Sequence, residues 1–291
     1  MKSHLVIGAS GQVGEHLMDV LRSRDVDCVG TSFSHPFDGL FQLDIRNLHD
    51  VRNLLSRVRP AVIHIPASLT NVDYCETHVE EGFAINVIGV KNIVQTVEEM
   101  GARIVYFSSD YIFDGVQGPY HEDAPANPIC EYGRQKLAAE HVVALQARDH
   151  LIIRTTVVYS WERQGKNFVQ RLITNLQNGQ SMRVPDDQIG NPTYAPELAQ
   201  AVVELVEQDL NGVFHVVGPE RTSRFEFACE AAKCFGLDVH LLKPVTTSEL
   251  GQKAARPLNA GMVTDKVMSY LKKPLSSYKD GLDRMVREKL A

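Results

Sequence analysis

The sequence predicts a doubly wound α/β fold, in which a parallel sheet carries helices on both faces. In the first half of the 291 residues, short apolar runs alternate with longer segments of helical periodicity. The apolar runs do not alternate with polar residues, which indicates strands that are buried on both sides. The helical segments between them are long enough to serve as crossovers between parallel strands. A parallel sheet between two layers of helices follows from these observations.

The expected elements alternate from the N-terminus onward. Strands are expected where the runs are short and rich in β-branched residues, and helices where apolar residues recur with helical spacing. The expected strands are 4–7, 28–31, 61–65, 104–108 and 151–154. The expected helices are 12–22, 48–58, 83–100 and 132–147.

The second half of the chain has a looser pattern. Its expected elements are helices at 165–178, 196–208 and 224–235 and a strand at 213–217. The sequence contains no internal repeat, and no linker separates two independent units. We therefore assign residues 1–157 to the sheet domain. Residues 158–291 are expected to form mainly a smaller lobe, with segments that return to the sheet.

Composition and charge exclude several classes of protein. The 36 acidic residues outnumber the 30 basic ones, and no basic cluster is present, so a nucleic-acid partner is not expected. The five cysteines form no CxxC pair, which argues against disulfides and zinc and favours a reducing compartment. The apolar run 4–7 is too short for a signal peptide or a membrane span. We expect a cytoplasmic protein that does not bind membranes.

A glycine-rich turn, GASGQVG at 8–14, follows the first expected strand and opens the first expected helix. Gly8 permits a tight turn, Gly11 lets a pyrophosphate approach the backbone, and Gly14 lets the helix pack closely on the sheet. The N-terminus of the helix then offers free N–H groups to the negative charge. This context indicates a Rossmann-type dinucleotide site, the alternative being a turn without a ligand. The candidate cofactor-binding residues here are Gly8, Ser10, Gly11, Gln12, Val13 and Gly14.

The end of the second expected strand bears on the choice between NADPH and NADH. A carboxylate there would hold the 2′-hydroxyl of NAD, and none is present. Ser32, Ser34 and His35 could instead donate to the 2′-phosphate of NADP, although no arginine accompanies them. The sequence therefore favours NADPH. Asp44 could accept from the adenine amino group or could cap the helix that opens near Asn47.

The pair Tyr132-x-x-x-Lys136 is a candidate catalytic pair. Residues four apart share one face of a helix, so the phenol and the ammonium can reach one ligand. A free phenol has a pKa near 10 and is a poor acid–base group at neutral pH. A nearby ammonium and an oxidised nicotinamide are expected to lower that pKa, so that Tyr132 can exchange a proton with an alcohol or ketone oxygen.

A second polar group ends the strand expected at 104–108. Ser108, Ser109 and Asp110 follow it at the carboxyl edge of the sheet, where doubly wound folds bind their ligands. A hydroxyl here can hydrogen-bond the substrate oxygen beside the phenol, although strand-end serines often bond only to the backbone. The order of glycine turn, strand-end serine and Tyr-x-x-x-Lys favours an oxidoreductase.

These residues resemble the dTDP-4-dehydrorhamnose reductase family, within the extended short-chain dehydrogenase/reductase superfamily. The resemblance extends over nearly the whole chain. It is carried by SSDYIFDG at 108–115, YHED at 120–123, YGRQK at 132–136, RTT at 154–156, DDQIGNPTYA at 186–195 and RPLN at 256–259.

The resemblance implies that a hydride passes from NADPH or NADH to the C4 ketone of a nucleotide-linked deoxysugar, in dTDP-rhamnose biosynthesis or a related pathway. Ser109 would orient the ketone, Tyr132 would donate the proton and Lys136 would bind the nicotinamide ribose. Asp110 would contact the sugar, so the substrate-binding residues are Ser109, Asp110 and Tyr132. The cofactor contacts implied by the family are Gly11, Gln12, Val13, Asp44, Ile45, Ala67, Ser68, Tyr132 and Lys136.

Three positions depart from the family pattern. Pro66 stands where the family often has alanine, and Val157 stands where many rhamnose reductases have a substrate-holding tryptophan. The C-terminal segment 277–290 lacks the three glutamates that bind magnesium in some family dimers, so no metal is expected.

Two alternatives remain open beside this function. The protein could be a reductase or epimerase of another sugar nucleotide, or a cofactor-binding regulatory subunit like the methionine adenosyltransferase β subunit. A monomer and a homodimer are both compatible with the sequence.

Overall fold

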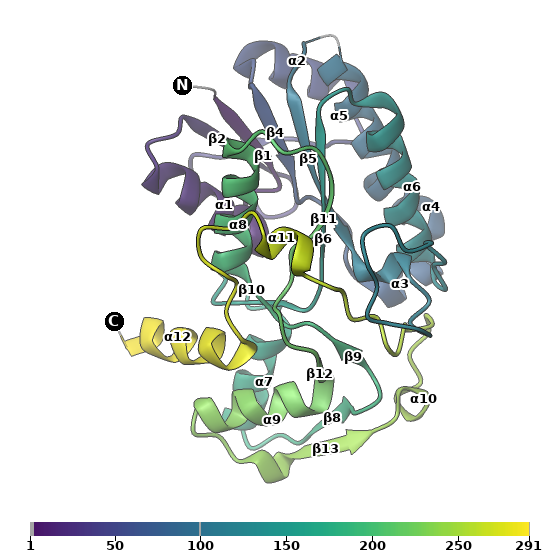
Figure 1. The fold of residues 1–291 in the computed structure, drawn as a ribbon, viewed down its shortest axis with the longest axis vertical. Helices are drawn as coiled ribbons and strands as arrows, with labels where there is room; N and C mark the ends of the chain where they lie inside the picture. Colours follow the sequence, from purple (N-terminus) through teal and green to yellow (C-terminus); the bar gives the residue numbers. More distant parts are fainter. Residues whose placement is uncertain (1–2, 99, 291) are drawn as a thin grey trace.

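The computed structural model describes residues 3–98 and 100–290, and its centre is a seven-stranded sheet (Figure 1). The strand order is β11-β6-β5-β4-β1-β2-β3, and all neighbours are parallel. The predicted doubly wound fold is thereby confirmed. The strands are β1 His4–Ile7, β2 Cys28–Ser32, β3 Phe41–Gln42, β4 Val62–Ile65, β5 Arg103–Ser109, β6 His150–Thr155 and β11 Gly212–His215.

Helices cover both faces of the sheet. One face carries α1 and α8, and the other carries α2, α5 and α6. Their bounds are α1 Gln12–Ser23, α2 Leu48–Val58, α5 Gly89–Glu98, α6 Glu131–Gln146 and α8 Ala195–Glu207.

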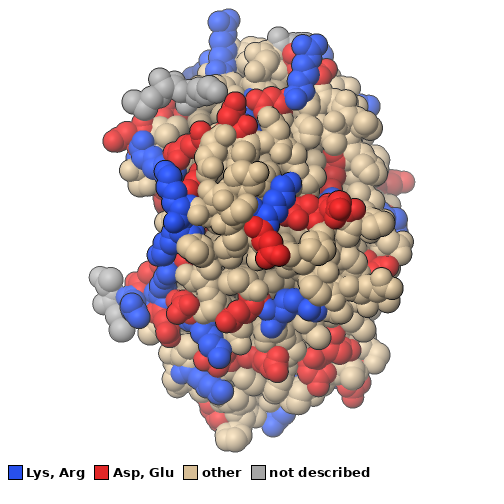
Figure 2. All heavy atoms as spheres, viewed as in Figure 1, with Lys and Arg blue, Asp and Glu red and all other residues tan. Residues whose placement is uncertain are grey.

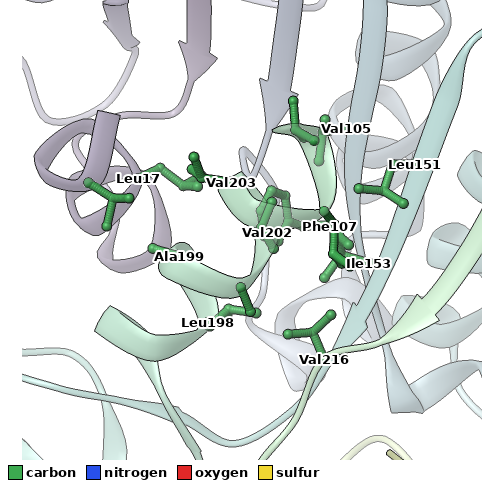
Figure 3. Packing of buried hydrophobic residues seen from close by; sticks show 14 of the residues in the cluster. Leu17, Val105, Phe107, Leu151, Ile153, Leu198, Ala199, Val202, Val203 and Val216 are labelled. Atoms are coloured by element: carbon green, nitrogen blue, oxygen red, sulfur yellow. The ribbon is translucent and has the colours of Figure 1, made fainter. Parts of the chain in front are cut away.

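Alternate residues of one strand supply the two cores. In β5, Val105 and Phe107 belong to the core beneath α1 and α8, whereas Ile104 and Tyr106 belong to the core beneath α2, α5 and α6. Figure 3 shows the first core, where Val202 of α8 lies among side chains of α1, β5 and β6. Burial on both faces explains why the strands are uninterrupted apolar runs.

The segment between β4 and α5 is more complex than the single helix expected at 83–100. It contains α3 Val72–Thr77, α4 Val79–Phe83 and a π-helical turn at Ala84–Ile88 before α5 begins. The wider turn carries Asn86, whose side chain is buried against the segment after β4. π-Helical turns of this kind often occur at functional sites. Residue 99, inside the expected helix, lies outside the described residues.

The short helix α11 Asp265–Met268 lies beside α8, and its Val267 joins the core beneath α1 and α8. Most of the remaining elements lie below the sheet in Figure 1 and form what we call the small lobe. It has its own core, built around Phe227, Val169 and Leu282. Its elements are α7 Phe168–Gln177, β8 Met182–Pro185, β9 Ile189–Gly190, β12 Thr222–Ser223, α9 Arg224–Cys234, β13 Leu242–Val245, α10 Thr247–Leu250 and α12 Tyr278–Leu290. The short strands β7 Val158–Tyr159 and β10 Thr193–Tyr194 pair where the lobe joins the sheet.

The surface is mixed in charge. Acidic and basic side chains are interspersed on the face drawn in Figure 2. Within residues 3–98 and 100–290, no helix combines the length and apolar character needed to span a bilayer.

Candidate functional site

The glycine turn between β1 and α1 has the geometry of a phosphate cradle. Gly8 has a φ of +95°, and a Cβ there would lie 2.9 Å from Ala67 Cα. A Cβ on Gly14 would lie 2.2 Å from Gly8 O, so only glycine lets α1 start this close to β1. A Cβ on Gly11 would meet only Gly8 O, at 3.5 Å, and Gly11 has no side chain to cap α1. The first-turn N–H groups can therefore reach an anion, and the turn fits a dinucleotide pyrophosphate.

The other predicted residues of this turn contact the segment after β7. The Gln12 side-chain amide lies 2.9 Å from Ser160 Oγ, and Ser10 O accepts from Gln164 Nε2 at 2.7 Å. Val13 is half-buried against the core beneath α1 and α8. The sequence alone did not indicate that this later segment closes on the glycine turn.

Asp44 and Ile45 follow the end of β3, which is the edge strand next to β2. The Asp44 carboxylate forms a two-pronged ion pair with Arg46 (2.7 Å from Nη2 to Oδ2), which lowers the pKa of Asp44. Asp44 is not the cap of α2, because Asn47 accepts from His49 N at 3.0 Å and fills that position. Ile45 is buried in the core beneath α2, α5 and α6.

Ala67 and Ser68 follow β4, and Ala67 lies against the glycine turn. Ala67 N donates to Ile7 O at 3.0 Å, which seats Ala67 against Gly8. The hydroxyl of Ser68 donates to Asn86 Oδ1 at 2.8 Å, and Asn86 Nδ2 donates to Gln135 Oε1 of α6 at 2.9 Å. Asn86 thus connects the segment after β4 to α6, the helix that carries the candidate catalytic pair.

Lys136 lies on the face of α6 that packs on β5. Its Nζ donates to Phe107 O at 2.5 Å and lies 4.4 Å from the centre of the Tyr106 ring. Burial lowers the pKa of Lys136 to about 7, and the nearby Glu140 carboxylate opposes the shift. Tyr132, one turn earlier, is buried as well.

Ser109, Asp110 and Tyr132 come together at the carboxyl end of β5. Ser109 Oγ donates to Asp110 Oδ1 at 3.0 Å. Burial raises the pKa of Asp110 to about 6, and contacts with Thr156 and Ser109 oppose the shift. The pKa of Tyr132 is raised by burial first and by the Asp110 charge second, while a contact with Ser109 opposes the rise.

The sequence-based expectation of a lowered Tyr132 pKa is therefore not met in the free protein. The phenol is buried, and removal of water disfavours the phenolate more than the contact with Ser109 favours it.

Ser32 is buried at the end of β2. In the sheet order, β2 lies next to β1, which leads into the glycine turn, so Ser32 lies on the glycine-turn side of β5.

A pocket opens beside Asp110, between the sheet and the small lobe. Its lining comes from β9, β12, α9 and the segments that directly follow β5 and β6. The residues are Asp110, Tyr111, Thr156, Val157, Gln188, Ile189, Gly190, Pro192, Thr222, Ser223, Arg224, Phe227 and Pro257. Val157 is in the left-handed region with a φ of +45°, which is strained for a β-branched side chain. The pocket has a small branched side chain at position 157.

Arg224 supplies positive charge to this pocket, and sequence reasoning missed it. The guanidinium lies 4.3 Å from the centre of the Phe168 ring, and Arg224 N donates to Gln188 O at 2.9 Å. Burial lowers the pKa of Arg224, while Tyr111 and Asp110 oppose the shift. Among the described residues, the guanidinium makes no ion pair and no hydrogen bond. The only sequence signal was its position after Ser223, which caps α9.

Trp161 Nε1 donates to Met285 O at 2.7 Å, and the ring packs edge-on against Phe235, so it belongs to the small-lobe core. In the part of the chain that the structure describes, no three His, Cys, Asp or Glu side chains are grouped to hold a metal ion.

Comparison with known proteins agrees with this geometry. The family model described as RmlD substrate binding domain matches residues 1–290. The dTDP-4-dehydrorhamnose reductase of Bacillus anthracis, solved in complex with NADP, has a TM-score of 0.90 and 30% identity, with 99% of each chain covered. Spore coat polysaccharide biosynthesis protein SpsK of Bacillus subtilis is 34% identical over 258 residues, which cover 88% of this chain and 87% of SpsK.

A relative of a different kind is also similar. Methionine adenosyltransferase 2 subunit beta of Xenopus tropicalis is 28% identical over 270 residues, which cover 90% of this chain and 80% of the subunit. The family match over nearly the full length, together with the glycine turn and the Tyr132–Lys136 pair, identifies the chain as a member of the dTDP-4-dehydrorhamnose reductase family in the extended short-chain dehydrogenase/reductase superfamily.

Proposed function

We propose that this protein reduces the 4-keto group of a nucleotide-linked deoxysugar, with NADPH or NADH as the reductant. One observation carries the proposal: Ser109, Asp110 and Tyr132 are buried together at the carboxyl end of β5, beside a pocket shared with the small lobe. The glycine turn that fits a dinucleotide lies along the same edge of the sheet.

The residues divide the chemistry among them. When bound, NADPH or NADH would supply a hydride to the ketone carbon. Tyr132 holds its proton at neutral pH, because burial raises the pKa of its phenol. It can therefore donate that proton to the ketone oxygen as the carbon–oxygen double bond becomes single. The Ser109 hydroxyl would orient the ketone, and Asp110 would accept from a sugar hydroxyl.

Lys136 would hold the dinucleotide rather than act on the sugar. Its buried Nζ donates to Phe107 O, and it would also bind a ribose hydroxyl of the dinucleotide. The positive charge would also stabilise the phenolate left on Tyr132 after proton transfer.

The charge of the pocket favours a nucleotide-linked substrate over a free sugar. Arg224 lies in its wall without a carboxylate paired to it among the described residues. A diphosphate between sugar and nucleoside would supply the missing negative charge through charge-assisted hydrogen bonds.

The test is the loss of absorbance at 340 nm when purified protein and NADPH meet a panel of 4-keto sugar nucleotides. We expect turnover with at least one 4-keto-6-deoxysugar nucleotide and none with the matching free sugars. A protein that binds NADPH yet reduces no member of the panel would reject the reductase. The cofactor-binding regulatory role, suggested by the similarity to the adenosyltransferase subunit, would then be preferred.

A further inference from the structure

Residues 160–167, between β7 and α7, form a bridge from the small lobe to the glycine turn. Gln164 Nε2 donates to Ser10 O at 2.7 Å, inside the turn itself. Arg163 Nε lies 2.6 Å from Glu15 Oε1 on the first turn of α1. This bridge therefore lies against the glycine turn and the start of α1, although it comes from the second half of the chain.

The bridge is fixed by its own hydrogen bonds. Asn167 caps α7 by accepting from Gln170 N at 3.2 Å, and Asn167 N donates to Glu162 Oε1 at 2.6 Å. Asn167 Nδ2 also donates to Gln170 Oε1 at 2.7 Å. These three hydrogen bonds fix Asn167, and they therefore also fix the backbone of its neighbour Lys166.

Lys166 extends from this bridge toward the loop after β2. Its Nζ lies 3.2 Å from His35 Nε2, and both residues are exposed. In residues 3–98 and 100–290, Lys166 forms no ion pair with a carboxylate. Arg163, three residues earlier, differs because Glu15 balances its charge. The Lys166 ammonium and the His35 imidazole thus lie side by side at the surface, and no carboxylate among the described residues pairs with the Lys166 charge.

The position of this point in the fold indicates its ligand. His35 follows Ser32, the last residue of β2, by three residues, and β2 pairs with β1, which leads into the glycine turn. In a dinucleotide-binding sheet, the end of the second strand faces the adenosine ribose. A carboxylate at this place would select the free 2′-hydroxyl, whereas a cation would select a 2′-phosphate.

We infer that Lys166 and His35 bind the 2′-phosphate of NADPH and make this protein prefer NADPH to NADH. The inference rests on the proposed function, because it assigns one end of the same dinucleotide site. It also adds the small lobe to cofactor selection, since Lys166 belongs to the segment that follows β7. The sequence after β2 has no arginine to bind a 2′-phosphate, and Lys166, from the segment after β7, would take that role.

The test is calorimetric titration of wild-type protein and Lys166→Ala with NADPH, NADH, 2′,5′-ADP and 5′-AMP. Loss of a charge-assisted contact should weaken NADPH and 2′,5′-ADP about tenfold or more. Binding of NADH and 5′-AMP should change by less than about twofold, because neither carries the 2′-phosphate. Lys166→Arg should retain the preference, and Lys243→Ala, on the exposed face of β13, is the control for a lost surface charge.

The outcomes separate the inference from the proposed function. Equal weakening of NADPH and NADH would overturn the inference, because Lys166 would then act on a group common to both cofactors. Unchanged binding of all four ligands would overturn it too. If the wild type binds neither cofactor, the reductase proposal itself fails. None of these readings requires turnover or a sugar substrate.

Discussion

Tyr132 and Lys136 are one turn apart on α6, and burial shifts their pKa values in opposite directions. The phenol becomes a weaker acid, and the pKa of the ammonium falls to about 7. Tyr132→Phe keeps the buried ring and removes only the proton donor. We expect turnover to fall about a hundredfold or more, as for a lost general acid, while NADPH still binds. The 340 nm assay and calorimetry measure the two effects, and a fully active phenylalanine variant would exclude Tyr132 as the donor.

Asp110 should make stability depend on pH. Its pKa of about 6 in the folded protein lies above the ordinary 3.8, so the folded state keeps a proton that the unfolded chain releases. Its contribution is therefore fully favourable below about pH 4 and is lost as pH rises toward 6. Asp110→Asn should remove this dependence and raise the free energy of unfolding at pH 7.5 by at most about 2–3 kcal/mol. Urea unfolding at pH 4.5 and 7.5 gives the free energy of unfolding of the wild type and of Asp110→Asn. Asp123→Asn, at an exposed position, is the control. A variant with the wild-type pH dependence would contradict the prediction.

At the scale of elements, α6 must approach the 3-10 turn Asp110–Ile112 closely enough to bring Tyr132 beside Ser109. A Cβ on Gly133 would lie 2.1 Å from Tyr111 O and 3.0 Å from Pro128 Cβ. Gly133→Ala should therefore displace the start of α6, cost about 1–3 kcal/mol of stability and reduce turnover. Arg134→Ala, the exposed neighbour on α6, should do neither. Thermal unfolding and the reductase assay compare the two variants, and an unaffected alanine variant would show that the helix can shift without loss.

The long elements could be predicted from the sequence because each carries its own periodic signal. The strands expected at 4–7 and 104–108 and the helix expected at 48–58 agree with β1, β5 and α2 within a residue or two at each end. The paired strands β9 and β12 could not be predicted in this way. Each has two residues, and they pair only because the fold brings Ile189 and Ser223 together. The π-helical turn likewise depends on a contact of Asn86 that no local pattern reveals.

At the scale of the whole molecule, the candidate site combines residues that a sequence pattern reveals with residues that no sequence pattern reveals. The glycine turn and the Tyr132–Lys136 spacing are visible in the sequence, because backbone and helix geometry fix them. Arg224 and Lys166 carry no local signal in the sequence. Arg224 lines the pocket and Lys166 lies beside His35 only because of the placement of the small lobe and the bridge. The division of the chain after residue 157 stays a prediction, while α8 and β11 from beyond it belong to the sheet layers.

An ion pair between Arg256 and Asp73 joins α3 to the segment that lines the pocket. Arg256 Nη2 lies 3.0 Å from Asp73 Oδ2, and Asp73 Oδ1 accepts from Ala254 N at 3.0 Å, so α3 holds the segment that brings Pro257 to the pocket wall. Arg256→Leu breaks this tie. The loss in stability should be only about 1–2 kcal/mol, because Asp73 is 37% exposed and solvent screens the pair.

Substrate binding should suffer more than stability does. We expect the KM for the sugar nucleotide to rise several-fold in Arg256→Leu, since the pocket wall is no longer held, while NADPH binds as in the wild type. Arg24→Leu removes a surface pair with Glu207 on the far side of α8 and is the matched control. Steady-state kinetics and NADPH titration distinguish the effects. Parallel losses of sugar-nucleotide and NADPH binding would mean that Arg256 supports the whole fold rather than the substrate end of the site.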